Sequence, residues 1–257
     1  MNRIQSLFDR QHEKIRSVYF CAGAPRTGLT AETIRSLQAH GIHLIEIGIP
    51  FSDPLADGPT IQAAATTALR NGTTLHSIFD ELTDIRRDVH VPLILMGYLN
   101  PILQFGFENF CRACQQCGID GVIVPDLPFD EYEAGYKETA RRYGLSVIFL
   151  VTPETSEERI RRIDEQSDSF IYAVSSAAVT GTQRDFDLQK QAYFERLKNM
   201  RLRNPFLIGF GISNRATREA AERHAAGTIV GSKFVSLLDE CQEPETAVVR
   251  LLEALDN

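Results

Sequence analysis

The sequence predicts an α/β protein, a parallel (β/α)8 TIM barrel in a single domain, on three observations. Eight short runs rich in β-branched and aromatic residues recur along the chain. Amphipathic segments separate them, and many of these end in glycine, which is common just past a helix. The length of 257 residues is typical of one α/β barrel. We therefore expect residues 1–257 to form one domain.

The predicted strands alternate with helical segments from one end of the chain to the other. The strands are expected at 17–23, 43–49, 92–98, 121–128, 146–153, 170–175, 205–211 and 227–232, and helices at segments such as 31–41, 74–88, 131–144, 156–166 and 216–227. The alternative is a doubly wound open sheet. The glycine-rich fingerprint of a dinucleotide site is absent after the first strand, which favours the barrel.

Charge and composition exclude several classes of partner. The net charge is −7, the isoelectric point is about 5.4, and the basic pairs at 86, 141 and 161 form no single stripe, so we expect no nucleic-acid partner. The first residues lack a signal-peptide core, and no apolar run approaches the roughly 20 residues of a membrane span. We expect a soluble, cytoplasmic protein without a membrane partner.

Three of the five cysteines lie close together in the segment CRACQQC, at 111, 114 and 117. The spacing resembles that of a metal or iron–sulfur site. The segment is predicted to be a helix that ends at Gly118, and no fourth ligand lies nearby. Because a free cysteine packs like a small hydrophobic residue, we favour a packing role and expect no metal.

The segment EIGIPFSDPLADGPTIQ (46–62) carries the first chemical signal. Leu44, Glu46 and Gly48 alternate with isoleucines, so Glu46 is expected to point into the barrel. Apolar surroundings raise the pKa of a carboxyl group and suit it to acid–base catalysis. A buried ion pair with Arg or Lys is the alternative. Asp57, in the following loop, supplies a second carboxylate that can fold over the barrel mouth.

Two glycine pairs indicate a phosphate site. GFGIS (209–213) ends the seventh predicted strand, and VGSKF (230–234) ends the eighth and opens a short helix. In barrels of this kind these loops and a helix N-terminus bind phosphate through backbone N–H groups, to which the Ser232 hydroxyl can add. Either pair alone is equally typical of a plain turn. The loop 175–187, which includes Thr180 and Gly181, has the composition of a lid.

The segment at 46–62 resembles the signature of tryptophan synthase alpha subunits, and the similarity extends over nearly the whole chain. It continues in SLF (6–8), YLNPI (98–102), VPDLP (124–128), VTG (179–181), GFGIS and VGS. The resemblance implies a lyase of tryptophan biosynthesis. Its reaction would be the retro-aldol cleavage of indole-3-glycerol phosphate to indole and glyceraldehyde 3-phosphate.

The resemblance also implies roles for individual residues. Glu46 would transfer protons, Asp57 would accept a hydrogen bond from the indole N–H, and Tyr172 would orient Glu46, unless it is simply a core tyrosine. The implied indole slot is formed by Tyr19, Met96, Ile123, Phe210 and Ile229, which would otherwise be barrel core. The implied phosphate ligands are Gly181, Gly211, Gly231 and Ser232.

A partner is implied as well. The chain would be the alpha subunit of an alpha-beta-beta-alpha complex whose beta subunit carries pyridoxal phosphate, with no cofactor in this chain. Asp53 and Thr180 would couple the loop and lid to that partner. Two alternatives are an activating subunit with weak turnover of its own and another phosphate-binding barrel such as a sugar-phosphate isomerase. The chain departs from the usual family residues at Ala24, Ser176, Ala178 and Lys233, which leaves lid closure and coupling open.

Overall fold

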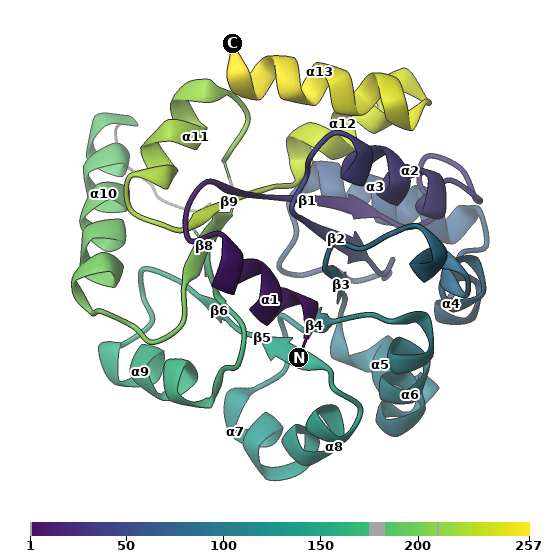
Figure 1. The fold of residues 1–257 in the computed structure, drawn as a ribbon, viewed down its shortest axis with the longest axis horizontal. Coiled ribbons are helices and arrows are strands. Elements are labelled where there is room, and N and C mark those ends of the chain that lie inside the picture. Colours follow the sequence, from purple (N-terminus) through teal and green to yellow (C-terminus); the bar gives the residue numbers. More distant parts are fainter. Residues whose placement is uncertain (1, 175–182, 210) are drawn as a thin grey trace.

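The computed structural model describes residues 2–174, 183–209 and 211–257, with only the backbone of 183–189. All strands are parallel and form one sheet in the order β5-β4-β3-β2-β1-β9-β8-β7-β6. The barrel closes through the chain itself, because β5 (Ser146–Ile148) pairs with β4 and β6 (Leu150–Val151) pairs with β7. Figure 1 shows the helices arranged around this central sheet.

The other strands are β1 (Ile15–Cys21), β2 (Leu44–Gly48), β3 (Leu93–Met96), β4 (Gly121–Ile123), β7 (Ile171–Val174), β8 (Phe206–Gly209) and β9 (Gly227–Val230). The helices are α1 (Arg3–Arg10), α2 (Thr30–Ala39), α3 (Pro59–Arg70), α4 (Leu75–Leu82), η1 (Ile85–Arg87), α5 (Leu99–Phe105), α6 (Phe107–Cys117), α7 (Phe129–Glu131), η2 (Tyr132–Tyr136), α8 (Lys137–Arg142), α9 (Glu157–Gln166), α10 (Gln183–Asn199), α11 (Arg215–Glu222), α12 (Ser232–Cys241) and α13 (Pro244–Asp256).

The barrel prediction is confirmed, and each of the eight expected strands is present. The fifth is divided at Phe149 into β5 and β6. The fourth ends at Ile123, five residues earlier than expected, because Pro125 and Pro128 have no N–H group for a strand ladder. The expected helix at 131–144 is also divided, into α7, the π-turn η2 and α8.

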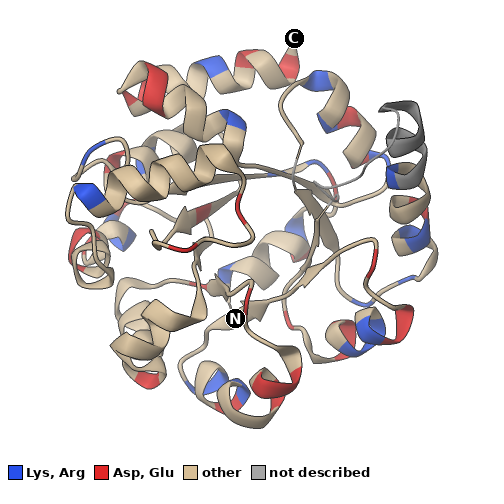
Figure 2. Ribbon diagram, turned by 180° about the vertical axis from the view of Figure 1, so that it is seen from behind, with Lys and Arg blue, Asp and Glu red and all other residues tan. Residues whose placement is uncertain are grey.

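Apolar side chains form two layers, one on each face of the strands. Alternation on β2 places Leu44 inside the barrel and the three isoleucines 45, 47 and 49 against the outer helices. Glu46 and Gly48 share the inward face of Leu44, as expected. Figure 2 shows that most charged residues lie on the outer helices.

The N-terminal helix α1 closes the end of the barrel at which the strands begin. Its Ile4, Leu7 and Phe8 are buried in the interior cluster, and Figure 1 shows α1 lying across the barrel. Asp120, which precedes β4 and is only 4% exposed, accepts hydrogen bonds from Arg3 of α1 (3.0 Å) and from Arg86 of η1 (2.6 Å). One carboxylate thus fixes α1 to the barrel.

The three clustered cysteines belong to α6 and are all buried against the outer face of the barrel. Their helix ends at Gly118, whose φ of 69° is the left-handed value that favours glycine. The predicted helix and its end are therefore confirmed. No group of His, Cys, Asp and Glu in the part of the chain that the structure describes is arranged to hold a metal ion. Within that same part, no helix is long and apolar enough to cross a membrane.

Candidate active site

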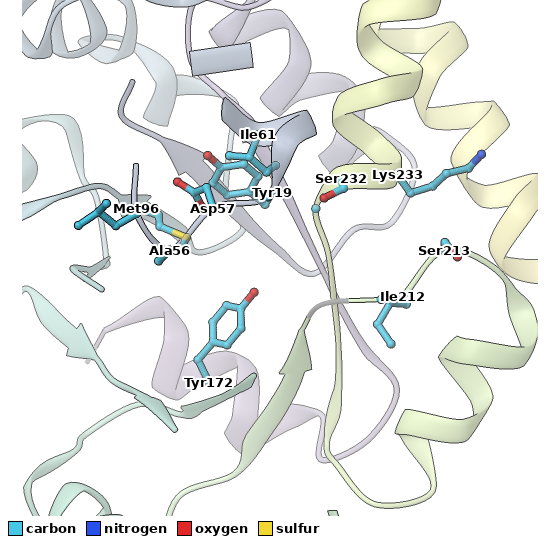
Figure 3. A pocket seen from close by; sticks show the side chains of 14 residues that line it. Tyr19, Ala56, Asp57, Ile61, Met96, Tyr172, Ile212, Ser213, Ser232 and Lys233 are labelled. Atoms are coloured by element: carbon cyan, nitrogen blue, oxygen red, sulfur yellow. The ribbon is translucent and has the colours of Figure 1, made fainter. Parts of the chain in front are cut away.

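A cavity of about 390 Å³ opens at the end of the barrel where the strands finish. It is lined by Tyr19, Leu55, Ala56, Asp57, Gly58, Ile61, Met96, Tyr172, Gly211, Ile212, Ser213, Gly231, Ser232 and Lys233. Figure 3 shows Asp57, Tyr19 and Met96 on one side, Tyr172 facing them, and Ser232 with Ser213 on a third side. Residues from β1, β3 and β7 and from the segments that follow β2, β8 and β9 thus meet at one site.

Glu46 lies in the middle of β2 and is fully buried. One carboxyl oxygen, Oε1, accepts a hydrogen bond from the Ser17 hydroxyl at 2.7 Å, whereas Oε2 has no hydrogen-bond partner among the described residues. Burial raises the pKa of Glu46 to about 7, although the Ser17 hydrogen bond opposes this effect. Glu46 therefore changes protonation near neutral pH, and no buried Arg or Lys pairs with it in the described structure.

Asp57 lines the cavity from the loop that joins β2 to α3. Its Oδ2 accepts a hydrogen bond from the Tyr98 hydroxyl at 3.0 Å. That hydroxyl also accepts from the backbone N–H of Ala56 at 2.9 Å, and the Tyr98 ring stacks on Phe51 with 5.3 Å between ring centroids. Burial raises the pKa of Asp57, and the Tyr98 hydrogen bond lowers it in part. Tyr98 thus fixes both the loop and its carboxylate.

Tyr172 comes from β7 and is 4% exposed. Figure 3 shows its hydroxyl pointing into the cavity from the side opposite Asp57. Burial raises its pKa well above the usual value, with further contributions from Glu46 and then Asp57. Gly209 makes room for the ring, because a Cβ at that position would lie 2.3 Å from the hydroxyl oxygen.

The glycine-rich ends of β8 and β9 form the third side of the cavity. Gly211 has a φ of 79°, which an L side chain rarely adopts. Gly231 precedes α12, whose first residue is Ser232, as the sequence predicted. The first N–H groups of a helix have no intrahelical partner and attract anions. Lys233 also lines the cavity, although Figure 3 shows its ammonium group directed away from Asp57 and Tyr172.

The structure brings together most of the predicted site residues that it describes. Tyr19 and Met96 line the cavity, whereas Ile123 and Ile229 are fully buried and contribute no lining surface. Asp53 is exposed on the loop outside the cavity, where it accepts a hydrogen bond from Ser52 at 2.5 Å. Phe210, Thr180, Gly181, Ser176 and Ala178 lie outside the described residues.

Three residues of the site have roles that the sequence analysis did not assign. Ser17, the partner of Glu46, lies two residues before Tyr19 on the same strand face, so alternation along β1 could have identified it. Tyr98, the partner of Asp57, lies in the YLNPI segment (98–102), two residues after β3. Ile61 reaches the cavity from α3, and no local pattern distinguishes it from a core residue.

These groups are a buried carboxyl group whose pKa burial raises to about 7, a second carboxylate on the cavity wall, and glycine-rich strand ends beside the N-terminus of α12. Asp57 lines the cavity, whereas Glu46 is fully buried on β2 and is not among the lining residues, so the two carboxyl groups have different surroundings. Paired carboxyl groups with different environments take different parts in acid–base chemistry. The arrangement suits acid–base chemistry on a small molecule bound in the cavity.

Comparison with known proteins identifies the family. The family model described as "Tryptophan synthase alpha chain" matches residues 8–257. A tryptophan synthase alpha chain from Phocaeicola vulgatus is 61% identical over 258 residues, covering 100% of both chains. One from Bacteroides fragilis is 60% identical over 256 residues, covering 100% of this chain and 97% of the relative.

Solved structures agree with the sequence comparison. The crystal structure of a tryptophan synthase alpha chain from Legionella pneumophila superposes with a TM-score of 0.88 at 32% identity, covering 100% of this chain and 98% of that one. A chain of the tryptophan synthase complex from Pyrococcus furiosus gives 0.83 at 33% identity, with coverages of 95% and 98%. The chain belongs to the tryptophan synthase alpha chain family.

Proposed function

We propose that this cavity is where the chain cleaves indole-3-glycerol phosphate to indole and glyceraldehyde 3-phosphate, with Glu46 as the acid–base group. Family membership assigns the chain to tryptophan biosynthesis as a carbon–carbon lyase. The observation that supports the site assignment is the fully buried Glu46 carboxyl group. Burial raises its pKa to about 7, and the strand register places Glu46 opposite Tyr19, a residue of the cavity wall. We propose that residues 1–257 act as one domain and in the cytoplasm.

The reaction requires two proton movements at adjacent atoms. Indole C3 must gain a proton before the ring can leave as neutral indole. The hydroxyl on the neighbouring side-chain carbon must lose its proton as the aldehyde forms. A carboxyl group that titrates near pH 7 is suited to both steps, because its proton is neither too tightly nor too weakly held. The Oε2 atom of Glu46 has no hydrogen-bond partner among the described residues and is therefore available for these proton transfers.

Asp57 is proposed to stabilise charge on the ring. Protonation at C3 leaves positive charge at the indole nitrogen, and a carboxylate that accepts a hydrogen bond from the N–H stabilises that charge. The Tyr98 hydrogen bond to Oδ2 leaves Oδ1 available for the substrate. Tyr172 is proposed to orient Glu46 or the substrate from the opposite wall.

The remaining subsites follow from the two ends of the substrate. The ring is proposed to lie among Tyr19, Met96 and Ile61, with the buried Ile123 and Ile229 beneath and Phe210 beside it. The phosphate is proposed to bind backbone N–H groups at Gly211, Gly231 and Ser232, whose position at the start of α12 supports this assignment. Thr180 and Gly181 are proposed to close over it as part of a lid.

A beta subunit that carries pyridoxal phosphate is the proposed partner, in an alpha-beta-beta-alpha complex, with no cofactor in this chain. The similar chain from Pyrococcus furiosus was solved as part of a tryptophan synthase complex, which supports this proposal. The loop between β2 and α3 offers a surface for contact, since Leu55 is 94% exposed next to the site. The same observation favours the second candidate function, an activating subunit with weak turnover of its own. The family assignment argues against a sugar-phosphate isomerase.

Replacing Glu46 with Gln tests the acid–base role. Gln keeps the shape and the Ser17 contact but transfers no proton, so we expect indole formation to fall by about 10²- to 10⁴-fold while KM changes little. Steady-state assays of the purified chain with indole-3-glycerol phosphate measure both constants. Glu165→Gln, an exposed change on α9, is the matched control. Near-normal turnover of Glu46→Gln would remove Glu46 from the mechanism.

The pKa of Glu46 predicts how stability depends on pH. Because the folded state raises this pKa from 4.5 to about 7, folding favours the protonated carboxyl group. The stability from this group is complete below the unfolded pKa and is lost as pH rises through about 7, by about 3 kcal/mol in total. Urea unfolding at pH 4.5, 6 and 8 should show Glu46→Gln gaining stability over the wild type by that amount. A difference that does not vary with pH would contradict this.

Gly231→Ala tests the phosphate subsite. Gly231 has a negative φ, and an added Cβ would lie 3.8 Å from Tyr19, an ordinary contact, so the fold should tolerate the methyl group. The methyl group would occupy space beside the proposed phosphate position, and we expect KM for indole-3-glycerol phosphate to rise about 10-fold or more. Dephosphorylated substrate should lose little further activity. Gly135→Ala, with open space around it, is the control. Equal losses on both substrates would instead indicate a damaged fold.

Asp53→Ala tests coupling to the partner. Coupling between sites is typically about 1–3 kcal/mol, so we expect a saturating beta subunit to raise kcat by roughly 5-fold or more. Asp53 is exposed on the rigid loop that carries Asp57, and its loss should reduce this activation more than it reduces the partner-free rate. Asp9→Ala, at the opposite end of the barrel, is the control. An unchanged kcat with bound beta subunit, verified by sedimentation, would refute the coupling.

A further inference from the structure

A tyrosine spans the distance between the proposed phosphate subsite and the two carboxyl groups. Tyr19 belongs to β1, and the register of the parallel strands places it opposite Glu46. The base of its side chain faces Gly231, because a Cβ on that glycine would lie 3.8 Å from Tyr19 Cδ1 and 3.9 Å from Tyr19 Cβ. The tip of the side chain lies over Gly48, where an added Cβ would come within 2.1 Å of the hydroxyl oxygen.

The position over Gly48 fixes the height of the hydroxyl in the barrel. Gly48 follows Glu46 by two residues on the same face of β2, one layer nearer the cavity mouth. Asp57 lies on that mouth, and Figure 3 shows Tyr19 and Asp57 on the same wall of the cavity. The Tyr19 hydroxyl is therefore located between the level of Glu46 and that of Asp57.

This hydroxyl has an unused hydrogen-bonding capacity. Tyr98 and Tyr193 each hydrogen-bond through their hydroxyl groups, to Asp57 and to the Val151 carbonyl. Tyr19 lines the cavity at 9% exposure, and its hydroxyl has no such partner within the described residues. Burial raises its pKa well above the usual value, and the charges of Cys21, Asp57 and Glu46 add to this effect. It is therefore a neutral donor and not a base.

We propose that Tyr19 is a specificity-determining residue that donates a hydrogen bond to the hydroxyl on the middle carbon of the substrate's three-carbon chain. The inference rests on the proposed function and adds to it. If the phosphate of the substrate lies at Gly231 and its ring lies at Asp57, the three carbons that join them run along the Tyr19 side chain. The hydroxyl nearest the ring reacts at Glu46, which leaves the middle hydroxyl for a donor that moves no proton.

Tyr19→Phe removes only the hydroxyl group and keeps the ring. We expect kcat/KM for indole-3-glycerol phosphate to fall by about 5- to 100-fold, because the middle hydroxyl loses its hydrogen-bond donor. The inhibitor arm uses indole-3-propanol phosphate, which has the ring and the phosphate but neither chain hydroxyl. Its inhibition constant should change by less than about 2-fold, since it never used the lost donor.

The control is Tyr132→Phe, a buried tyrosine of η2 outside the barrel, which should alter neither constant. Equal weakening of the substrate and the propanol analogue by Tyr19→Phe would mean that Tyr19 only packs against the ring, and would overturn the proposal. An active wild type with an equally active Tyr19→Phe would overturn it while leaving the proposed function intact. A wild type that does not cleave the substrate would overturn both.

Discussion

The burial of one carboxyl group inside the barrel is the constraint on which this site depends. Glu46 is surrounded by the side chains of neighbouring strands, and a single hydroxyl, that of Ser17, is its described hydrogen-bond partner. An apolar residue at that position would avoid the cost of removing a carboxylate from water. The barrel tolerates Glu46 because the group is readily protonated, and this same property makes it useful near neutral pH.

The residues around Glu46 follow from that constraint. Gly48 and Gly209 have no side chains, and the space they leave is occupied by the hydroxyl ends of Tyr19 and Tyr172. Two small residues thus allow two large polar ones to face the same cavity. Asp57 is kept apart from this layer on a loop, where Tyr98 holds it. The separation allows the two carboxyl groups to differ in burial and hence in protonation.

The fold was predictable because each strand and helix has its own local pattern, and the orientation of Glu46 followed from the two-residue period of β2. The start of α12 after Gly231 was also predictable from the sequence, since glycine and serine mark the start of that helix. The contacts between different helices and strands were not predictable. Ile61 reaches the cavity because the loop that carries Asp57 places the first turn of α3 beside it, and Phe149 divides a strand for reasons that its neighbours in sequence do not encode. Such features depend on residues that meet after folding.

Helix α1 affects where small molecules can enter and leave the barrel. Because Ile4, Leu7 and Phe8 fill the end at which the strands begin, the barrel interior communicates with solvent at its opposite end. In the part of the chain that the structure describes, the mouth that admits a substrate also gives the products of its cleavage a way out. A protein bound over that mouth would therefore lie on the path of the departing fragments.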